Sequence, residues 1–270
     1  MRNDNKKNIV RNSEFGIRSK GKNNSAIHNP HSEFKKVYII GIGPGSLDYL
    51  IPAAKKEIEK AECLIGGSRI LSLFDYPDKK KVCLDGCYRD AISYIQKNKE
   101  KEKIAVLVSG DPGLYSFLGQ VSSVLGKEEY EVIPGISSLQ LAFAKSGESW
   151  HDAKIISLHG REVGNLAEDI KKSNKVFLFT DKKFPPSEIA DYLLNNGIEN
   201  RKVLVFEELS YPGENILETN LESLMRNAEC GMRNEEKEET EMRSAECGVR
   251  NEEENKLERG KLCVMIILKR

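Results

Sequence analysis

The sequence predicts a protein of two α/β domains with mostly parallel sheets. Three observations predict this fold class. Short apolar runs rich in β-branched residues alternate with amphipathic stretches of helical length, which is the pattern of parallel strands joined by covering helices. Glycine-rich turns follow several of these runs. The alternation begins again after a polar turn at 147–150, and this restart indicates a second domain.

The N-terminal domain is expected over residues 36–147. Its clearest buried strand is the uninterrupted apolar run 104–108, and 37–42 has the same character and ends in glycines. Pro52 suits the first turn of a helix. Strands are predicted at 37–42, 63–65, 104–108 and 130–133, and helices at 52–61, 89–97, 114–125 and 137–145.

The C-terminal domain is expected over residues 148–270. Its apolar runs are again short, and the first two are each followed by a stretch with helical periodicity. Strands are predicted at 154–158, 176–179, 203–206 and 262–268, and helices at 165–171 and 187–195. Ligands of such folds collect at the carboxyl ends of the strands, so the motifs at those ends are the most informative about function.

Two polar segments dilute the predicted core. Residues 1–35 are rich in Asn, Lys, Arg and Ser without apolar periodicity, so we interpret them as a disordered tail. Residues 226–259 are expected to interrupt the C-terminal domain as a low-complexity insertion, in which 225–231 is nearly repeated 17 residues later at 242–248. The block has too few large apolar residues to fold alone. We interpret it as translated repetitive sequence in a tolerant position, and a binding module is the alternative.

Charge and hydropathy exclude several classes of protein. Lysine plus arginine is 42 and aspartate plus glutamate is 42, and this balance excludes a generally basic nucleic-acid binder. The longest apolar run near the C-terminus, 262–268, is far shorter than the roughly 20 residues of a membrane helix. The N-terminus lacks the apolar stretch of a signal peptide. We therefore expect a cytoplasmic protein with no membrane span, whose six cysteines stay reduced.

A glycine-rich turn, containing Gly43, Pro44 and Gly45, follows the first predicted strand. Glycines let the chain turn sharply and let the backbone approach a ligand. A dinucleotide-binding loop has the spacing G-x-G-x-x-G and opens directly into a helix. Here the spacing is G-x-G-x-G and the next helix is expected only near Pro52. A loop lining a pocket for another ligand is therefore favoured over a nicotinamide-binding Rossmann protein.

Two further motifs follow the third and fourth predicted strands. Asp111, in the run S-G-D-P-G-L, either accepts hydrogen bonds from ligand hydroxyls or amines or caps the next helix. Ser137 and Ser138, after a Pro-Gly turn, either cap a helix or bind a ligand. The residues alone leave these alternatives open.

His159 and Arg161 follow the first strand of the second domain in the run L-H-G-R. A structural and a functional role for the histidine both stay open, whereas arginine at this place suits an anionic substrate through paired hydrogen bonds to a carboxylate. Cys83 and Cys87 form a C-x-x-x-C pair, but further ligands at a suitable spacing are missing. No metal site is therefore expected.

Taken together, the motifs resemble those of the tetrapyrrole (corrin/porphyrin) methylase family. The resemblance rests on residues 38–46 with 50–54 after them, on 110–112 and on 134–138, and it covers about residues 36–225 plus the last strand. Three further segments are similar to the branch of the family that methylates carbon-5 of precorrins; they are 65–69, 140–144 and 157–161.

The resemblance implies two α/β domains with S-adenosylmethionine bound in the cleft between them. It implies a methyltransferase that acts on carbon-5 of a (cobalt-)precorrin, a tetrapyrrole, in cobalamin biosynthesis. It places Gly43, Pro44 and Gly45 at the tetrapyrrole. The cofactor-binding residues that it implies are Gly110, Asp111, Leu114, Ser137, Ser138, Thr180 and Leu209.

The substrate of such an enzyme carries several carboxylates, so Arg69 and Arg161 are expected to anchor it. His159 is expected to handle a proton or to orient the substrate. The resemblance also implies a homodimer, and a separate protein that supplies the decarboxylation and carbon-15 methylation that some relatives carry in a fused domain. No nucleic-acid or membrane partner is expected.

Two alternatives stay open. One is another member of the family with a different methylation site or acceptor, such as uroporphyrinogen, diphthine or an rRNA ribose. The other is a non-enzymatic scaffold that uses the insertion at 226–259 as its interaction element.

Overall fold

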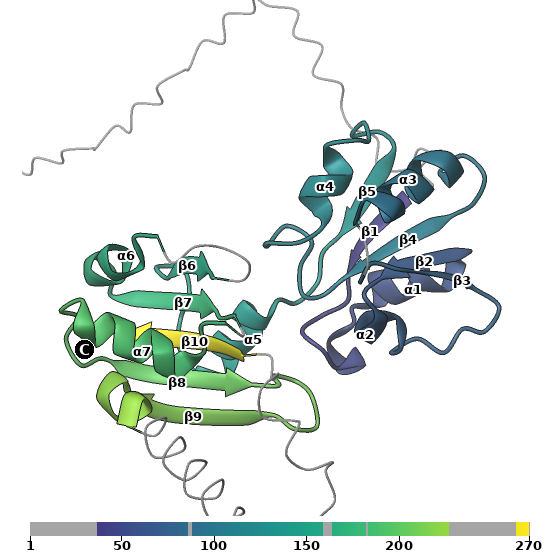
Figure 1. The fold of residues 1–270 in the computed structure, drawn as a ribbon. Coiled ribbons are helices and arrows are strands. Elements are labelled where there is room, and N and C mark those ends of the chain that lie inside the picture. Colours follow the sequence, from purple (N-terminus) through teal and green to yellow (C-terminus); the bar gives the residue numbers. More distant parts are fainter. Residues whose placement is uncertain (1–36, 86–87, 159–163, 182, 227–262, 270) are drawn as a thin grey trace, which may run out of the picture. The chain divides into compact units, whose positions relative to one another are not determined.

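The computed structural model describes residues 37–85, 88–158, 164–181, 183–226 and 263–269. These residues form two five-stranded sheets with helices packed against them (Figure 1), and the predicted α/β class is confirmed. The predicted tail at 1–35 and residues 227–259 of the predicted insertion lie outside the described residues.

The first sheet is parallel throughout and has the strand order β3-β2-β4-β1-β5. The neighbouring inner strands β4 and β1 consist mainly of apolar residues that are almost wholly buried, as expected for a sheet covered on both faces. The parallel order brings the carboxyl ends of β1, β4 and β5 to one edge. The strands are β1 (Val37–Gly41), β2 (Cys63–Gly66), β3 (Lys80–Cys83), β4 (Ile104–Val108) and β5 (Tyr130–Ile133).

Two apolar cores lie on the opposite faces of this sheet. Ile40 packs with Ile58 of α1 in one core, and its neighbour Ile39 packs with Ile95 of α3 in the other, because successive strand residues point to opposite faces. The helices are α1 (Pro52–Lys60), α2 (Ser68–Leu71), α3 (Tyr88–Asn98) and α4 (Leu118–Ser122).

The second sheet is mixed and has the order β6-β7-β10-β8-β9. β6 and β7 pair in parallel, whereas β10 lies antiparallel between β7 and β8, and β9 lies antiparallel at the outer edge of β8. The prediction of mostly parallel sheets is therefore wrong for this half, since β10 is antiparallel to both of its neighbours and the short connection 208–214 joins β8 to β9 as an antiparallel hairpin. The strands are β6 (Lys154–Ser157), β7 (Lys175–Phe179), β8 (Lys202–Glu207), β9 (Asn215–Asn220) and β10 (Cys263–Leu268).

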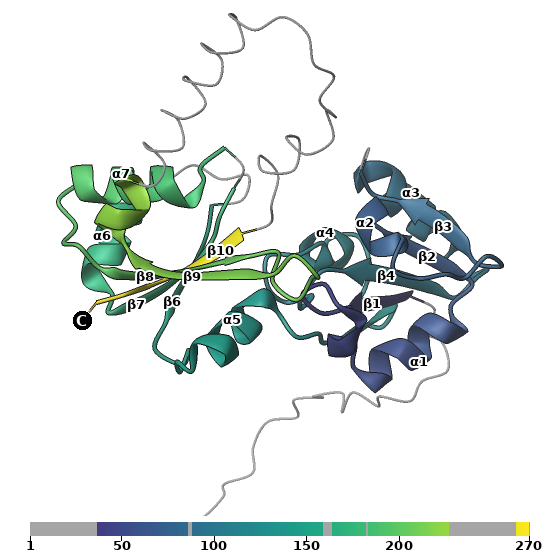
Figure 2. The ribbon, with the colours of Figure 1, turned by 90° about the horizontal axis from the view of Figure 1, so that it is seen from below.

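Helix α5 (Ser138–Ser146) lies on one face of the second sheet, and α6 (Leu166–Lys172) and α7 (Pro186–Asn195) lie on the other (Figure 2). Phe143 of α5 packs on Phe177 of β7, with ring centroids 6.0 Å apart. α5 thus directly follows the first sheet in sequence but packs on the second. The predicted domain boundaries stay predictions.

Several short or exposed elements were not predicted. The side chains of the edge strands β3 and β9 are mostly exposed and polar, so these strands lack the apolar run that identifies a buried one. Helix α2 has only four residues. The helix predicted at 114–125 is confined to α4. Across the described ranges, we find no helix that is long and apolar enough to span a membrane.

Three glycines meet backbone to backbone where β1, β4 and β5 end. A Cβ atom on Gly135 would lie 2.2 Å from the carbonyl oxygen of Gly110, and a Cβ atom on Gly41 would lie 2.5 Å from the same oxygen. Real Cβ atoms do not approach other atoms within 3.0 Å. The ends of the three strands therefore approach one another more closely than any other residue type permits.

We expect Gly135→Ala to lower the free energy of unfolding by about 3 kcal/mol, the upper end for overpacking, because the new methyl group meets backbone atoms that cannot move aside. Gly119→Ala in α4 is the control, since a Cβ atom there meets nothing within 4 Å. This change should stabilise the helix by up to about 1 kcal/mol. Urea unfolding measures both. A Gly135→Ala protein as stable as the wild type would contradict the close contact.

Candidate active site

A cavity of about 540 Å³ is lined by loops of both sheets. The first sheet contributes residues that follow β1, β4 and β5, and the second contributes residues at the ends of β6, β7 and β8 and the start of β10. Pro44, which we predicted at the substrate, lines this cavity. Every residue that we predicted at the cofactor lines it too: Gly110, Asp111, Leu114, Ser137, Ser138, Thr180 and Leu209.

The loops after β1 and β4 are joined by backbone hydrogen bonds. The Gly110 amide donates to the Gly43 carbonyl at 2.8 Å, and the Ile42 amide donates to the Val108 carbonyl at 3.0 Å. Gly43 and Gly110 have φ of 92° and 67°, a region that favours glycine. The glycines of both motifs are thus needed for the turns that bring Pro44 and Asp111 to one cavity.

Asp111 ties two loops together. One carboxylate oxygen accepts a hydrogen bond from the Gly113 amide at 2.8 Å, and the other accepts one from the Gly135 amide at 3.1 Å. Asp111 therefore does not cap the next helix, which was the structural alternative: the N-cap of α4 is Phe117, and the Asp111 carboxylate instead joins its own loop to the loop after β5. Each carboxylate oxygen has a further lone pair, so the same side chain can still accept a hydrogen bond from a ligand.

Ser137 and Ser138 begin α5 but differ in their surroundings. Ser137 is the N-cap of a capping box: its hydroxyl accepts from the Gln140 amide at 3.2 Å, and the Gln140 side chain accepts from the Ser137 amide at 2.8 Å. The Ser138 side chain has no hydrogen-bond partner that we can identify among the described residues, and it lines the cavity. Ser138 is therefore the better placed of the two to bind a ligand.

The second sheet supplies a wall with several apolar side chains. Phe179, Phe206, Leu209 and Val264 line the cavity. The Thr180 hydroxyl donates to the Cys263 carbonyl at 2.7 Å, which joins the end of β7 to the start of β10. The first sheet lines its side of the cavity mainly with hydroxyl, carboxylate and backbone groups, whereas the second sheet contributes the charged Asp181 and Lys183 as well as apolar side chains.

Cys263 lines the same wall with a neutral thiol. Burial, aided by the nearby Glu207 carboxylate, raises the pKa of Cys263 to about 12. The thiolate form, which is the nucleophile, is therefore absent at neutral pH. Residues 227–262, which precede Cys263, lie outside the described residues, but the strand that they lead into begins at the cavity.

Two further residues that we predicted at the substrate, Gly45 and Arg69, contact Tyr211. Gly45 lies against the ring of Tyr211, to which a Cβ atom on Gly45 would approach within 2.2 Å. The Nε atom of Arg69 donates to the hydroxyl of Tyr211 at 3.1 Å. His159 and Arg161 lie outside the described residues, so their roles stay predictions. Strand β6, which precedes them, ends at the cavity-lining Ser157.

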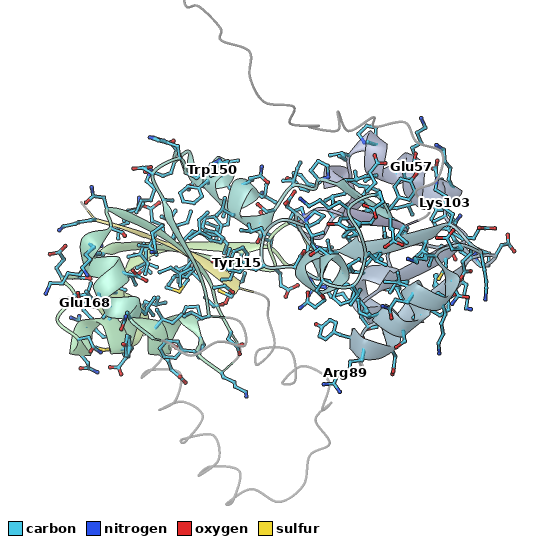
Figure 3. All side chains as sticks on the ribbon, turned by 90° about the horizontal axis from the view of Figure 1, so that it is seen from above. Glu57, Arg89, Lys103, Tyr115, Trp150 and Glu168 are labelled. Atoms are coloured by element: carbon cyan, nitrogen blue, oxygen red, sulfur yellow. The ribbon has the colours of Figure 1, made fainter. Side chains whose placement is uncertain are left out.

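Sequence reasoning missed several cavity residues. Tyr115 (labelled in Figure 3) has a φ of 50°. Its ring packs edge-to-face on Phe179, with centroids 5.6 Å apart. Ser157 and Phe206 were also missed. Their positions at or near strand ends were the available signal. Within the described ranges, no group of His, Cys, Asp and Glu is placed to hold a metal ion.

Comparison with known proteins identifies the family. The model of the tetrapyrrole (corrin/porphyrin) methylases matches residues 36–225. The chain is 39% identical over 188 residues to the probable cobalt-precorrin-7 C(5)-methyltransferase of Methanocaldococcus jannaschii, covering 67% of this chain and 87% of that protein. It is 33% identical over 178 residues to the cobalt-precorrin-7 C(5)-methyltransferase of Salmonella typhimurium, covering 66% of this chain and 87% of that protein.

Solved structures share the fold at lower sequence identity. One is the uroporphyrin-III C-methyltransferase of Thermus thermophilus complexed with S-adenosylhomocysteine, with a TM-score of 0.59 and 19% identity over 86% of this chain and 91% of that one. The match of the family model over most of the chain and the two relatives above 30% identity lead to one conclusion: this chain belongs to the tetrapyrrole (corrin/porphyrin) methylase family.

Proposed function

We propose that this protein is an S-adenosylmethionine-dependent methyltransferase that methylates carbon-5 of a (cobalt-)precorrin in cobalamin biosynthesis. One observation carries the proposal. The residues that the family resemblance implies at the cofactor come from distant parts of the chain, and all of them line one cavity. The names of the relatives at 39% and 33% identity support the choice of carbon-5.

The cavity suits this cofactor in size and chemistry. Its volume of about 540 Å³ falls within the roughly 300–1,000 Å³ of small-molecule sites. The wall with Phe179 and Leu209 suits an adenine ring, and the side with Ser138 suits the polar ribose and amino-acid groups. When bound, S-adenosylmethionine supplies an electrophilic methyl group.

The residues of the chain have to position the acceptor carbon in line with that methyl group and exclude water. Positioning of this kind supplies most of the rate of a transfer that needs little acid–base chemistry. The neutral thiol of Cys263 does not compete for the methyl group, because only a thiolate is strongly nucleophilic. His159 is proposed to handle a proton or to orient the substrate, and Arg69 and Arg161 to bind its carboxylates.

The fold alone does not decide the acceptor, since the Thermus thermophilus neighbour is named for uroporphyrin-III. A different acceptor is therefore the main alternative. The family resemblance also supports a homodimer, with a separate protein for decarboxylation and carbon-15 methylation, and the sequence pattern of the N-terminus supports a cytoplasmic location.

Calorimetric titration with S-adenosylhomocysteine tests the cofactor site. The wild-type protein should bind one equivalent. Ser138→Ala should bind about fivefold more weakly, the loss of one hydrogen bond. Ser138→Phe should abolish detectable binding because its ring occupies the cavity. Unchanged affinity of the Ser138→Phe protein would place the cofactor elsewhere.

Methyl transfer from S-adenosylmethionine labelled with ¹³C in its methyl group tests the reaction. We expect one labelled methyl group on cobalt-precorrin-7 or its cobalt-free counterpart, with the ¹³C resonance assigned to carbon-5. Uroporphyrinogen III and the precursor from which diphthine is made should stay unlabelled. Preferential labelling of either of these would replace the proposed acceptor by the alternative.

Deletion of residues 227–259 tests the scaffold alternative. Asn220 of β9 pairs with Lys202 and Cys263 of β10 pairs with Glu207, so the two strands that flank the deletion lie at opposite ends of β8, about 20 Å apart. A Gly/Ser linker of about twelve residues covers this distance on average, and residues 221–226 and 260–262 are retained beside it. We expect cofactor affinity and methyl transfer within about twofold of the wild type, because a low-complexity insertion with few large apolar residues contributes little to the folded core. If neither the wild-type nor the deleted protein transfers a methyl group, and only the deleted protein fails to bind a partner protein, the scaffold is favoured.

A further inference from the structure

We infer that Tyr211 is a positioning residue. It holds the guanidinium of Arg69 at the cavity, so that the terminal nitrogens of Arg69 bind a carboxylate of the macrocycle. This inference rests on the proposed function. Tyr211 itself lines the cavity, whereas Arg69 is exposed.

Two contacts fix the guanidinium on the tyrosine. Its Nε atom donates to the Tyr211 hydroxyl at 3.1 Å, and its central carbon lies 4.3 Å from the centroid of the Tyr211 ring. A cation over an aromatic ring is attracted by the ring's negative face. Both contacts leave the Nη1 and Nη2 atoms of Arg69 without a partner that we can identify among the described residues. Those two nitrogens form the edge that binds a carboxylate through two parallel hydrogen bonds.

The Tyr211 ring is held in turn by the turn after β1. Because Gly45 has no side chain, the ring lies directly against its backbone. The amide of Ser46 donates to the Ser210 hydroxyl at 3.0 Å. The ring thus contacts both Gly45 and Arg69, two residues that we predicted at the substrate.

The connection 208–214 that carries Tyr211 is rigidly built. Glu208 and Ser210 both have positive φ, of 47° and 72°, which non-glycine residues adopt only where the surroundings enforce it. The Glu214 carboxylate accepts from the Ser210 amide at 2.7 Å and pairs with Lys145 of α5 at 2.7 Å. The hydrogen bond with Glu214 raises the pKa of Lys145, so the pair stays charged at neutral pH.

Arg69 is fixed from its own side as well. It lies in α2, whose first amide, that of Ser68, donates to the Asp85 carboxylate at 3.0 Å. The helix is thereby attached to the segment that follows β3. Arg69 and Tyr211 each come from a braced segment, so their contact presents the guanidinium in one orientation, which lowers the entropy that the substrate must overcome on binding.

A double-mutant cycle with uroporphyrin I, a porphyrin with carboxylates on all its side chains, tests the inference. Binding is measured by fluorescence titration, and Arg89→Gln, which removes one exposed arginine of α3 (Figure 3), is the control without effect. Arg69→Gln should weaken binding by about 10- to 100-fold, as expected for a charge-assisted pair. Tyr211→Phe, which keeps the ring, should weaken it by about fivefold. In the Arg69→Gln background, Tyr211→Phe should change the affinity by less than about 1.5-fold, because the tyrosine hydroxyl acts through the arginine.

The outcomes separate this inference from the proposed function. Independent effects of the two changes, or a Tyr211→Phe protein that binds uroporphyrin I like the wild type, would overturn it and leave Tyr211 a merely structural contact. Failure of the wild-type protein to bind uroporphyrin I would overturn it too. S-adenosylhomocysteine titrations of the same proteins report on the cofactor site: if the wild type does not bind, the proposed function fails, whatever the porphyrin cycle shows.

Discussion

The backbone contact among Gly41, Gly110 and Gly135 is the constraint on which the rest of the site depends. The parallel order of the first sheet brings three strand ends to one edge, but only the lack of side chains lets the loops beyond them touch. Asp111 then fastens the loop after β4 to the loop after β5. Ser137 follows directly and starts α5. The polar side of the cavity is thus a consequence of close backbone packing.

Helix α5 connects the strand ends of the first sheet to the second sheet. It begins at the cavity and packs its apolar face on β7, β8 and β10, where Phe177 and Phe206 are fully buried. The wall of the cavity and the core beneath it are formed by the same strands. A change in the packing of α5 would therefore move both sides of the cavity, whereas changes on the far face, against α6 and α7, would not.

The sequence predicts the buried strands well, because continuous apolar runs such as 104–108 mark them. It predicts that the residues of several motifs line one cavity, because the family motifs lie at strand ends, which a parallel sheet brings together. It does not predict β9, whose side chains are exposed, nor the antiparallel course of β10. The contact of Arg69 with Tyr211 joins residues 142 positions apart, and no local pattern marks such a pair.

The crystal structure of the protein with S-adenosylhomocysteine would test the account most directly. The account predicts density for the ligand inside the cavity between Ser138 and Leu209, with its sulfur toward Pro44, so that the methyl group of the cofactor would face the predicted substrate loop. Density for the ligand at any other place, or in this cavity with the sulfur directed away from Pro44, would contradict the assignment of the cofactor and substrate sides.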